Sequence, residues 1–299
     1  MGSITASSLL GSTAAITMAS GSSFRLDQGN WPWNSKDNDT SIGAGLVEVL
    51  PSLWQSSSLP IAAAGLDTLD ALALFRGINF STYSASNTSG YKPAGGANYG
   101  LSSINSTFGT QLQNVAQLIK RNVGLRIATI DLGGWDTHNG QGTPKDGGYD
   151  YFGLQVQGLS DGLNQFYTDL ASDPAGNYMQ HVTVITVSEF GRRVHENDSG
   201  GTDHGYGTIM MALGASVNGG KVYGTFPGLG PDQLFEGADV NVTTDYRQVL
   251  SEAMIRRLGN PNIYYAFPGY SGYTPLGIFQ GTDLPPSDFD KIFKNGFDS

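Results

Sequence analysis

Cysteine is absent from the 299 residues of this chain. Disulfide bonds, thiolate metal sites and thiol nucleophiles are therefore excluded. Basic residues are scarce as well, because 16 Lys and Arg stand against 26 Asp and Glu, which leaves a formal net charge of −10. A protein that binds a phosphate backbone needs clustered positive charge, so we expect no nucleic-acid partner.

Long apolar runs are also missing. No stretch of about 18 consecutive apolar residues occurs, and we therefore predict no membrane span. Residues 1–20 lack the basic region of a signal peptide, since the first charged side chain is Arg25, and no export signal is expected within this chain. A hydrophobic fraction of 39% nevertheless predicts a folded core, and 42 glycines predict many loops.

The sequence motifs of several common enzyme classes are absent too. No G-x-S-x-G segment occurs, which argues against the serine mechanism of α/β-hydrolases. No phosphate-binding loop is present, and no G-x-G-x-x-G follows a predicted strand, so a nucleotide cofactor is not expected.

The residues that are present predict a single domain over residues 1–299. Residues 1–60 show little periodicity and are expected to form an irregular segment that covers the domain. Residues 107–259 carry the periodic patterns of the core. Residues 260–299 are rich in Pro, Gly and Tyr, and we expect them to wrap around the surface.

Hydrophobic periodicity predicts four helices, over residues 63–77, 107–123, 149–170 and 245–258. Thr243 or Thr244 could cap the last of these helices. In each helix, apolar residues recur at spacings of three and four, which indicates one face turned toward a core.

Three apolar runs, over residues 125–132, 182–187 and 209–213, predict strands. Helices that alternate with strands are typical of an α/β fold, so we predict one mixed, mostly parallel sheet flanked by helices. If residues 209–213 return antiparallel to 182–187, residues 188–208 form the hairpin connection between them.

Titratable side chains gather in two Gly-rich loops next to these strands. Asp136 and His138 follow the first strand, Glu189 follows the second, and Asp203 and His204 precede the third. One carboxylate and two imidazoles suit Zn²⁺ or Mn²⁺, with Fe²⁺, Mg²⁺ and Ca²⁺ as alternatives. Asp136, His138 and His204 are therefore the predicted metal ligands, and Asp203 and Glu189 are predicted to bind a second metal or to orient the histidines.

Two arginines lie in the same loop. Arg192 and Arg193 could pair with a tetrahedral oxyanion such as phosphate or sulfate. Alternatively, they could do no more than neutralise Glu189 and Glu196. Asp and His in Gly-rich loops also form turns without binding any ligand, and that alternative stays open here.

Several short motifs carry a family resemblance: LGGWDTHN, VSEFGRRVHEN, GTDHGYG, GASVNGGKVYG, TDYRQVL and AFPGY. In order, over roughly residues 108–270, they closely resemble the bacterial family known as domain of unknown function 1501. That family is similar to the alkaline phosphatase and sulfatase superfamily. The resemblance implies a three-layer sandwich and a metal-dependent hydrolase of phosphate or sulfate esters.

Residue by residue, Asp136, His138 and His204 look like the first metal site of the superfamily. The resemblance implies catalytic roles for Glu189 and Arg192, and an arginine that holds the anion of the substrate. Phe190 stands where the superfamily has the histidine of an Asp-His pair, and a phenyl ring cannot bind a metal. A second metal site of the superfamily type would lack this ligand here, and the number of metals stays open.

The resemblance also bears on the rest of the protein. The first strand and the Ser or Thr nucleophile of the superfamily are not found, so the chain is expected to be the carboxyl-terminal part of a longer protein or a shortened member. Family members are usually exported, which implies a periplasmic or secreted protein whose substrate is a small anionic ester or a sulfated or phosphorylated glycan. The alternative is a non-catalytic surface, assembly or carbohydrate-binding protein, the last using Trp31, Trp33 and Trp54.

Overall fold

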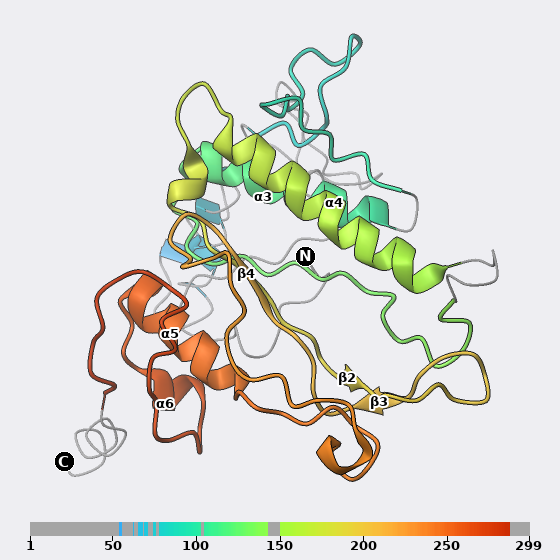
Figure 1. The fold of residues 1–299 in the computed structure, drawn as a ribbon. Helices are drawn as coiled ribbons and strands as arrows, with labels where there is room; N and C mark the ends of the chain where they lie inside the picture. The colour runs from blue at the N-terminus through green and yellow to red at the C-terminus, as the bar shows by residue number, and fades with distance from the viewer. Residues whose placement is uncertain are drawn as a thin grey trace. The chain divides into compact units, whose positions relative to one another are not determined.

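The computed structural model describes residues 54–55, 62, 65–67, 69–70, 74–75, 78–102, 105–142 and 150–287 (Figure 1). The covering segment expected over residues 1–60, with Trp31 and Trp33, lies outside these residues except for Trp54 and Gln55. The last part of the expected tail, from residue 288 onward, lies outside them as well. No helix of the described part is long and apolar enough to cross a membrane.

The chain divides into two compact units. The first comprises Met1–Gly133 and Gly158–Ser172, and the second comprises Gly134–Gln157 and Asp173–Ser299. Helix α4 (Tyr151–Ala171) begins in the second unit and ends in the first. The prediction of one continuous domain stays a prediction.

The first unit contains helix α3 (Ser106–Lys120) and most of α4. Both helices agree with the predicted ranges to within three residues. Gly158 and Gly162 of α4 lie against Asn105 and the side chains of Phe108 and Leu112, where a Cβ on either glycine would collide with those side chains. Two glycines four residues apart lie on the same face of a helix, which explains how α4 comes close to α3 (Figure 1).

A buried carboxylate ties this unit together. The side chain of Asp169, on α4, is fully buried and lies 2.5 Å from the Lys120 ammonium group. It also accepts hydrogen bonds from the hydroxyls of Tyr91 and Tyr99 and from the backbone N–H of Ala94, at 2.6 to 2.8 Å. Burial, followed by the negative charge of Asp169, raises the pKa of Tyr99. The charge is therefore fully paired and its role is structural.

In the described residues, the α-helices that lie wholly in the second unit are α5 (Tyr246–Leu258) and the short α6 (Ile263–Ala266). Helix α6 contacts α5. The carboxylate of Asp245 accepts a hydrogen bond from the backbone N–H of Arg247 and so caps α5, whereas a threonine cap was predicted. Gly259 ends α5 in the left-handed conformation, at φ 65°, as the pattern predicted. Two short 3₁₀ helices, η5 (Tyr178–Gln180) and η6 (Pro231–Gln233), complete the helical elements of this unit in the described residues.

Four short strands form two antiparallel pairs. Strand β1 (Val184–Thr186) pairs with β4 (Met211–Leu213), and β2 (Gly191–Arg192) pairs with β3 (His204–Gly205). The hairpin predicted for residues 188–208 is therefore confirmed, because Val184 lies opposite Leu213 at its base. The structure mixes α-helices and β-strands as expected, but the strands of the described residues form two-stranded antiparallel sheets, and the larger parallel sheet is not confirmed.

The strand expected over residues 125–132 is not formed. These residues pair with no strand of the described part, and the side chain of Ile127 is 67% exposed. The second and third apolar runs are also less buried than predicted, since Val187 and Ile209 are 56% and 76% exposed, respectively. An apolar run shows that a segment can form a strand, but a strand also needs a neighbour for its backbone N–H and C=O groups, which periodicity does not reveal.

The core of the second unit joins the base of the hairpin to α5. Val249, Ile278 and Phe279 form its buried centre, and Ile185 of β1 and Ala212 of β4 pack against them. This packing matters because an isolated two-stranded sheet is only marginally stable in water. The core thus fixes the two ends of the segment that carries the candidate site.

Candidate metal centre

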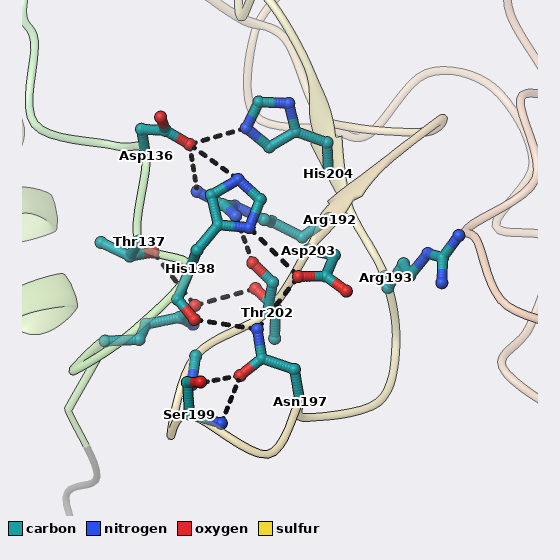
Figure 2. A network of polar contacts seen from close by, with 12 residues as sticks. Asp136, Thr137, His138, Arg192, Arg193, Asn197, Ser199, Thr202, Asp203 and His204 are labelled. Atoms are coloured by element: carbon teal, nitrogen blue, oxygen red, sulfur yellow. Dashed lines mark hydrogen bonds and ion pairs between the residues drawn. The ribbon is translucent and has the colours of Figure 1, made fainter.

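Two loops of the second unit form the candidate site. One contains residues 135–142, and the other is the part of the hairpin between β2 and β3 (Figure 2). Three backbone hydrogen bonds join them: the N–H of Thr202 donates to the carbonyl of Thr137, that of Gly140 to Ser199, and that of Gln141 to Gly200. Their N···O distances are 2.9 to 3.3 Å, so the loops meet directly through the main chain.

Gly201 makes this close approach possible. A Cβ at this position would lie 2.4 Å from the carbonyl carbon of His138 and 2.5 Å from the carbonyl oxygen of Thr137. Both neighbours are backbone atoms, which cannot move aside as the end of a side chain can. Only glycine fits between the two loops here.

Asp136, His138 and His204 converge on one point. The Oδ1 atom of Asp136 lies 2.7 Å from Nε2 of His204 and 3.2 Å from Nε2 of His138. One potential ligand atom from each of the three side chains lies within 4.8 Å of the others. The structure thus brings together the three residues that the sequence predicted as metal ligands.

Asp203 lies on the other side of the His138 ring. Its Oδ1 atom is 3.1 Å from Nδ1 of His138, whereas Nε2 of that ring faces Asp136. The amide of Asn197 donates to the same Asp203 oxygen at 3.0 Å and to the backbone carbonyl of His138 at 2.8 Å (Figure 2). This is the arrangement of a carboxylate that orients an imidazole ligand, which is one of the two roles predicted for Asp203.

The guanidinium group of Arg192 spans the two loops. Its Nη2 atom donates to the backbone carbonyl of Trp135 and its Nη1 atom to that of Thr202. Nη2 also lies 3.9 Å from Oδ1 of Asp136, and the side chain is only 20% exposed. Arg192 was predicted to hold the substrate anion, yet two of its nitrogens already bind main-chain carbonyls.

Aromatic rings stack against the imidazoles. The ring centroid of Phe190 lies 3.7 Å from that of His204, with the two planes 10° apart. The ring of His204 stacks in turn on that of His138, at a centroid distance of 4.7 Å. Phe190 therefore supports the position of the His204 ring.

Both carboxyl groups of the site favour the ionised form. The hydrogen bond from His204 is the main reason that the pKa of Asp136 lies below its ordinary value, with His138 and Arg192 acting in the same direction. The pKa of Asp203 is lowered first by the hydrogen bond from Asn197 and then by that from His138. Both groups are therefore charged at neutral pH and can attract a cation.

The site is open to solvent. The side chains of Asp136, His138 and His204 are 66%, 48% and 45% exposed, respectively. An ion with these three ligands would keep free coordination positions, as catalytic sites do and closed structural sites do not. A donor set of one carboxylate oxygen and two imidazole nitrogens fits Zn²⁺, Mn²⁺ or Fe²⁺.

Two of the predicted residues lie apart from the cluster. Glu189 is exposed, and no hydrogen bond or ion pair joins it to the site within the described ranges. Nε of Arg193 lies 3.5 Å from Asp239, and Figure 2 shows its side chain pointing away from the histidines. The catalytic role of Glu189 stays a prediction.

Two residues of the site, Asn197 and Gln141, were missed in the sequence. Asn197 orients Asp203, while Gln141 accepts hydrogen bonds from the hydroxyls of Thr137 and Thr202 at 3.1 and 2.8 Å. Asn and Gln in Gly-rich loops are too common to stand out. The signal available was their position, because each lies within six residues of a predicted ligand or of Asp203.

The comparisons with known proteins point to one family. A family model described as "Protein of unknown function (DUF1501)" matches residues 80–259, more than half of the chain and every residue of the site described above. No curated protein and no solved structure matches the chain. The chain belongs to the DUF1501 family.

Proposed function

We propose that this protein is an exported, metal-dependent hydrolase of phosphate or sulfate esters. The observation that carries the proposal is the convergence of Asp136, His138 and His204 on one point open to solvent. The similarity of the family motifs to alkaline phosphatases and sulfatases supports this class of substrate. We also propose that the protein has the sandwich fold of that superfamily. The substrate is a small anionic ester or a sulfated or phosphorylated glycan.

The bound divalent ion would polarise the ester oxygen and stabilise the negative charge that develops there. The chain's own residues prepare the place for it. His138 is held by Asp203 and His204 by Phe190, so both imidazoles keep their direction before any ligand arrives. This preorganisation is what a hydrolytic site requires.

Charge at the site supports an anionic substrate only when the cation is present. The charges of Asp136, Asp203 and Arg192 sum to −1, since two carboxylates stand against one guanidinium. A divalent ion changes this sum to +1. The metal-free site therefore repels an anionic ester and the metal-bound site attracts it.

We propose water as the attacking group. The nearby hydroxyls of Thr137 and Thr202 donate to Gln141, and that of Ser188 donates to the carbonyl of Phe190 at 2.7 Å. These acceptors are amide and peptide carbonyl oxygens, which are too weakly basic to take up the proton that a nucleophilic hydroxyl must lose. The open face of the cluster gives water direct access.

A non-catalytic protein of the same fold is the second candidate. The observation that favours it is the stacking of Phe190 on His204. By the family resemblance, this phenyl ring stands where two-metal members of the superfamily would need a ligand. Such a protein would bind a cation and an anionic glycan at a surface without turnover. The carbohydrate-binding alternative rests on Trp31, Trp33 and Trp54, and of these three only Trp54 lies in the described residues.

Elemental analysis of the purified protein tests the proposal. We expect about one equivalent of a divalent ion in the wild type and a loss of that ion in His138→Ala/His204→Ala. The chain has four histidines, so His181→Ala/His195→Ala is the matched control and keeps the metal. A screen of phosphate and sulfate esters then follows with the loaded protein.

The outcomes separate the two candidates. Turnover that requires both the ion and the two site histidines supports the hydrolase. A stoichiometric ion without turnover of any ester supports the non-catalytic protein. A wild type that takes up neither Zn²⁺ nor Mn²⁺ on incubation overturns both metal-dependent readings.

A further inference from the structure

Arg192 stands out because its guanidinium group binds a main-chain carbonyl in each of the two loops of the candidate site. Its backbone lies opposite His204 in the β2–β3 pair. Its guanidinium group donates to the carbonyls of Trp135 and Thr202, each of which directly precedes an acidic residue of the site. It also lies over the Phe190 ring, with Cζ 4.8 Å from the centroid.

These contacts run between the two loops that carry the metal-binding candidates. Asp136 and His138 lie in one loop and His204 in the other. Asp136 and His204 are 68 residues apart in the sequence, so the distance between the two loops is not set by the local chain. Two parallel N–H groups on a rigid, planar guanidinium fix the distance between two carbonyls in a way that a single flexible donor cannot.

We infer that Arg192 is a positioning residue that clamps the loops together and thereby sets the geometry of Asp136, His138 and His204. This inference rests on the proposed function for its meaning, since the clamped residues are the proposed metal ligands. The clamp itself is a property of the metal-free protein. It assigns to Arg192 a role different from the anion binding that the family resemblance implies.

The sign of one mutational effect distinguishes the clamp from simple electrostatics. Arg192 places a positive charge 3.9 Å from a carboxylate that is proposed to bind a cation. If the charge alone mattered, Arg192→Gln would remove a repulsion and strengthen Zn²⁺ binding. If Arg192 clamps the loops, the same change weakens Zn²⁺ binding, by about 10- to 100-fold as for other residues that orient ligands.

Arg192→Lys provides the second test. Lysine keeps the charge but lacks the planar pair of donors, so it cannot hold both carbonyls with the same geometry. The clamp predicts Zn²⁺ affinity between those of the wild type and Arg192→Gln. Affinity equal to that of the wild type would show that only the charge matters and would overturn the inference.

Arg193→Gln is the matched control. It removes the same charge one residue away, from a side chain that is 52% exposed and pairs with Asp239 instead of the loop carbonyls. We expect Zn²⁺ affinity within about twofold of the wild type. A loss as large as that in Arg192→Gln would mean that the effect is not specific to the clamp.

Hydrogen–deuterium exchange of the metal-free proteins keeps the inference testable if the proposed function fails. The amides of Gly140, Gln141 and Thr202 form the backbone bonds between the loops. They should exchange faster in Arg192→Gln than in the wild type or Arg193→Gln, while the amides of α5 are unchanged. A faster exchange of α5 as well would indicate general unfolding, and Arg192→Lys would then decide the question.

A direct role of Arg192 in binding the substrate anion is the remaining alternative to the clamp. Inorganic phosphate binding to the Zn²⁺-loaded variants is measured by isothermal titration calorimetry. Lost phosphate binding in Arg192→Gln with unchanged Zn²⁺ affinity and unchanged exchange would assign Arg192 to the anion. A wild type that binds no Zn²⁺ would end the proposed function, whereas the exchange comparison would still test the clamp.

Discussion

The imidazole of His138 lies between two carboxylates, with Nδ1 3.1 Å from Asp203 and Nε2 3.2 Å from Asp136. One ring nitrogen is thus held by an orienting partner while the other faces the proposed ion. Asn197 donates to the same oxygen of Asp203 and so fixes the orienting partner itself. The roles of the two carboxylates follow from the ring nitrogen that each one meets.

Removing the orienting carboxylate should weaken metal binding without abolishing it. We expect Asp203→Ala to reduce Zn²⁺ affinity by about 10- to 100-fold, because His138 loses the group that fixes its ring. Asp203→Asn keeps an acceptor for the ring N–H and should lose less. Competition with a chromophoric chelator measures the affinities, and a larger loss in Asp203→Asn than in Asp203→Ala would contradict the assigned role.

Adding one methyl group at Gly201 should separate the loops. The new Cβ would overlap the backbone of Thr137 and His138, so we expect Gly201→Ala to destabilise the protein by about 1–3 kcal/mol. Gly219→Ala is the control, because a Cβ there meets no atom within 4 Å and the backbone is not left-handed. Urea denaturation compares the two variants, and equal midpoints would refute the close approach at Gly201.

Anion binding should depend on the cation. The metal-free site carries a net charge of −1 from Asp136, Asp203 and Arg192, so inorganic phosphate should bind at least about tenfold more weakly than to the Zn²⁺-loaded protein. Raising the salt concentration should reduce this difference, since the charges are exposed. Isothermal titration calorimetry at two ionic strengths provides the measurement. Equal phosphate affinity with and without Zn²⁺ would contradict the charge argument.

The cap of α5 should make stability depend on pH. Hydrogen bonds from Arg247 hold the pKa of Asp245 below its ordinary value of 3.8. A lowered pKa in the folded state contributes stability above the ordinary pKa, and this contribution is lost as the pH falls through the folded value. We expect Asp245→Ala to cost about 1 kcal/mol at pH 7.

Asp245→Asn separates the charge from the cap, because its side-chain oxygen can still accept the hydrogen bond of Arg247. At pH 7 it should be less destabilising than Asp245→Ala. The difference between the wild type and Asp245→Asn should shrink when the pH is lowered below 3.8. Thermal unfolding at pH 7 and in acid tests this prediction. A stability difference between the wild type and Asp245→Asn that grows in acid would contradict the predicted direction of the pH dependence.

Glu252 should be the most sensitive acidic residue of the second unit. Its carboxylate is fully buried and accepts hydrogen bonds from the backbone N–H groups of Leu276, Gly277 and Phe279, at 2.6 to 3.0 Å. Glu252→Ala leaves these buried donors without their acceptor and removes one of the two carboxylate partners of Arg256, at a cost of about 3–5 kcal/mol. The exposed Glu196→Gln is the control and should change the free energy of unfolding by less than about 0.5 kcal/mol.

The helices were the part of the fold that the sequence predicted best. A long amphipathic pattern needs only local information, and α3, α4 and α5 all lie within a few residues of the predicted ranges. The hairpin was also predictable, because two apolar runs enclose one polar loop. The strand over residues 125–132 failed because its pattern says nothing about a pairing partner.

The candidate ligands could be named from the sequence, but their supports could not. Asp136, His138 and His204 stand out by residue type in a chain with four histidines. Arg192, in contrast, binds two backbone carbonyls, and every residue carries a carbonyl, so no side-chain identity marks its partners. The ring nitrogen that Asp203 meets is likewise a matter of orientation, which spacing along the chain does not contain.

The exposure of the three candidate ligands has a consequence for any preparation of the protein. An ion held at an open surface exchanges directly with the surrounding solution, because no closed shell of side chains slows its departure. The occupant would follow the supply of divalent ions and their intrinsic order of affinity, in which Cu²⁺ and Zn²⁺ exceed Mn²⁺. The metal found after isolation would then depend on the divalent ions in the purification buffers as much as on those in the cell. The biologically relevant ion would be the one available in the compartment where the protein works.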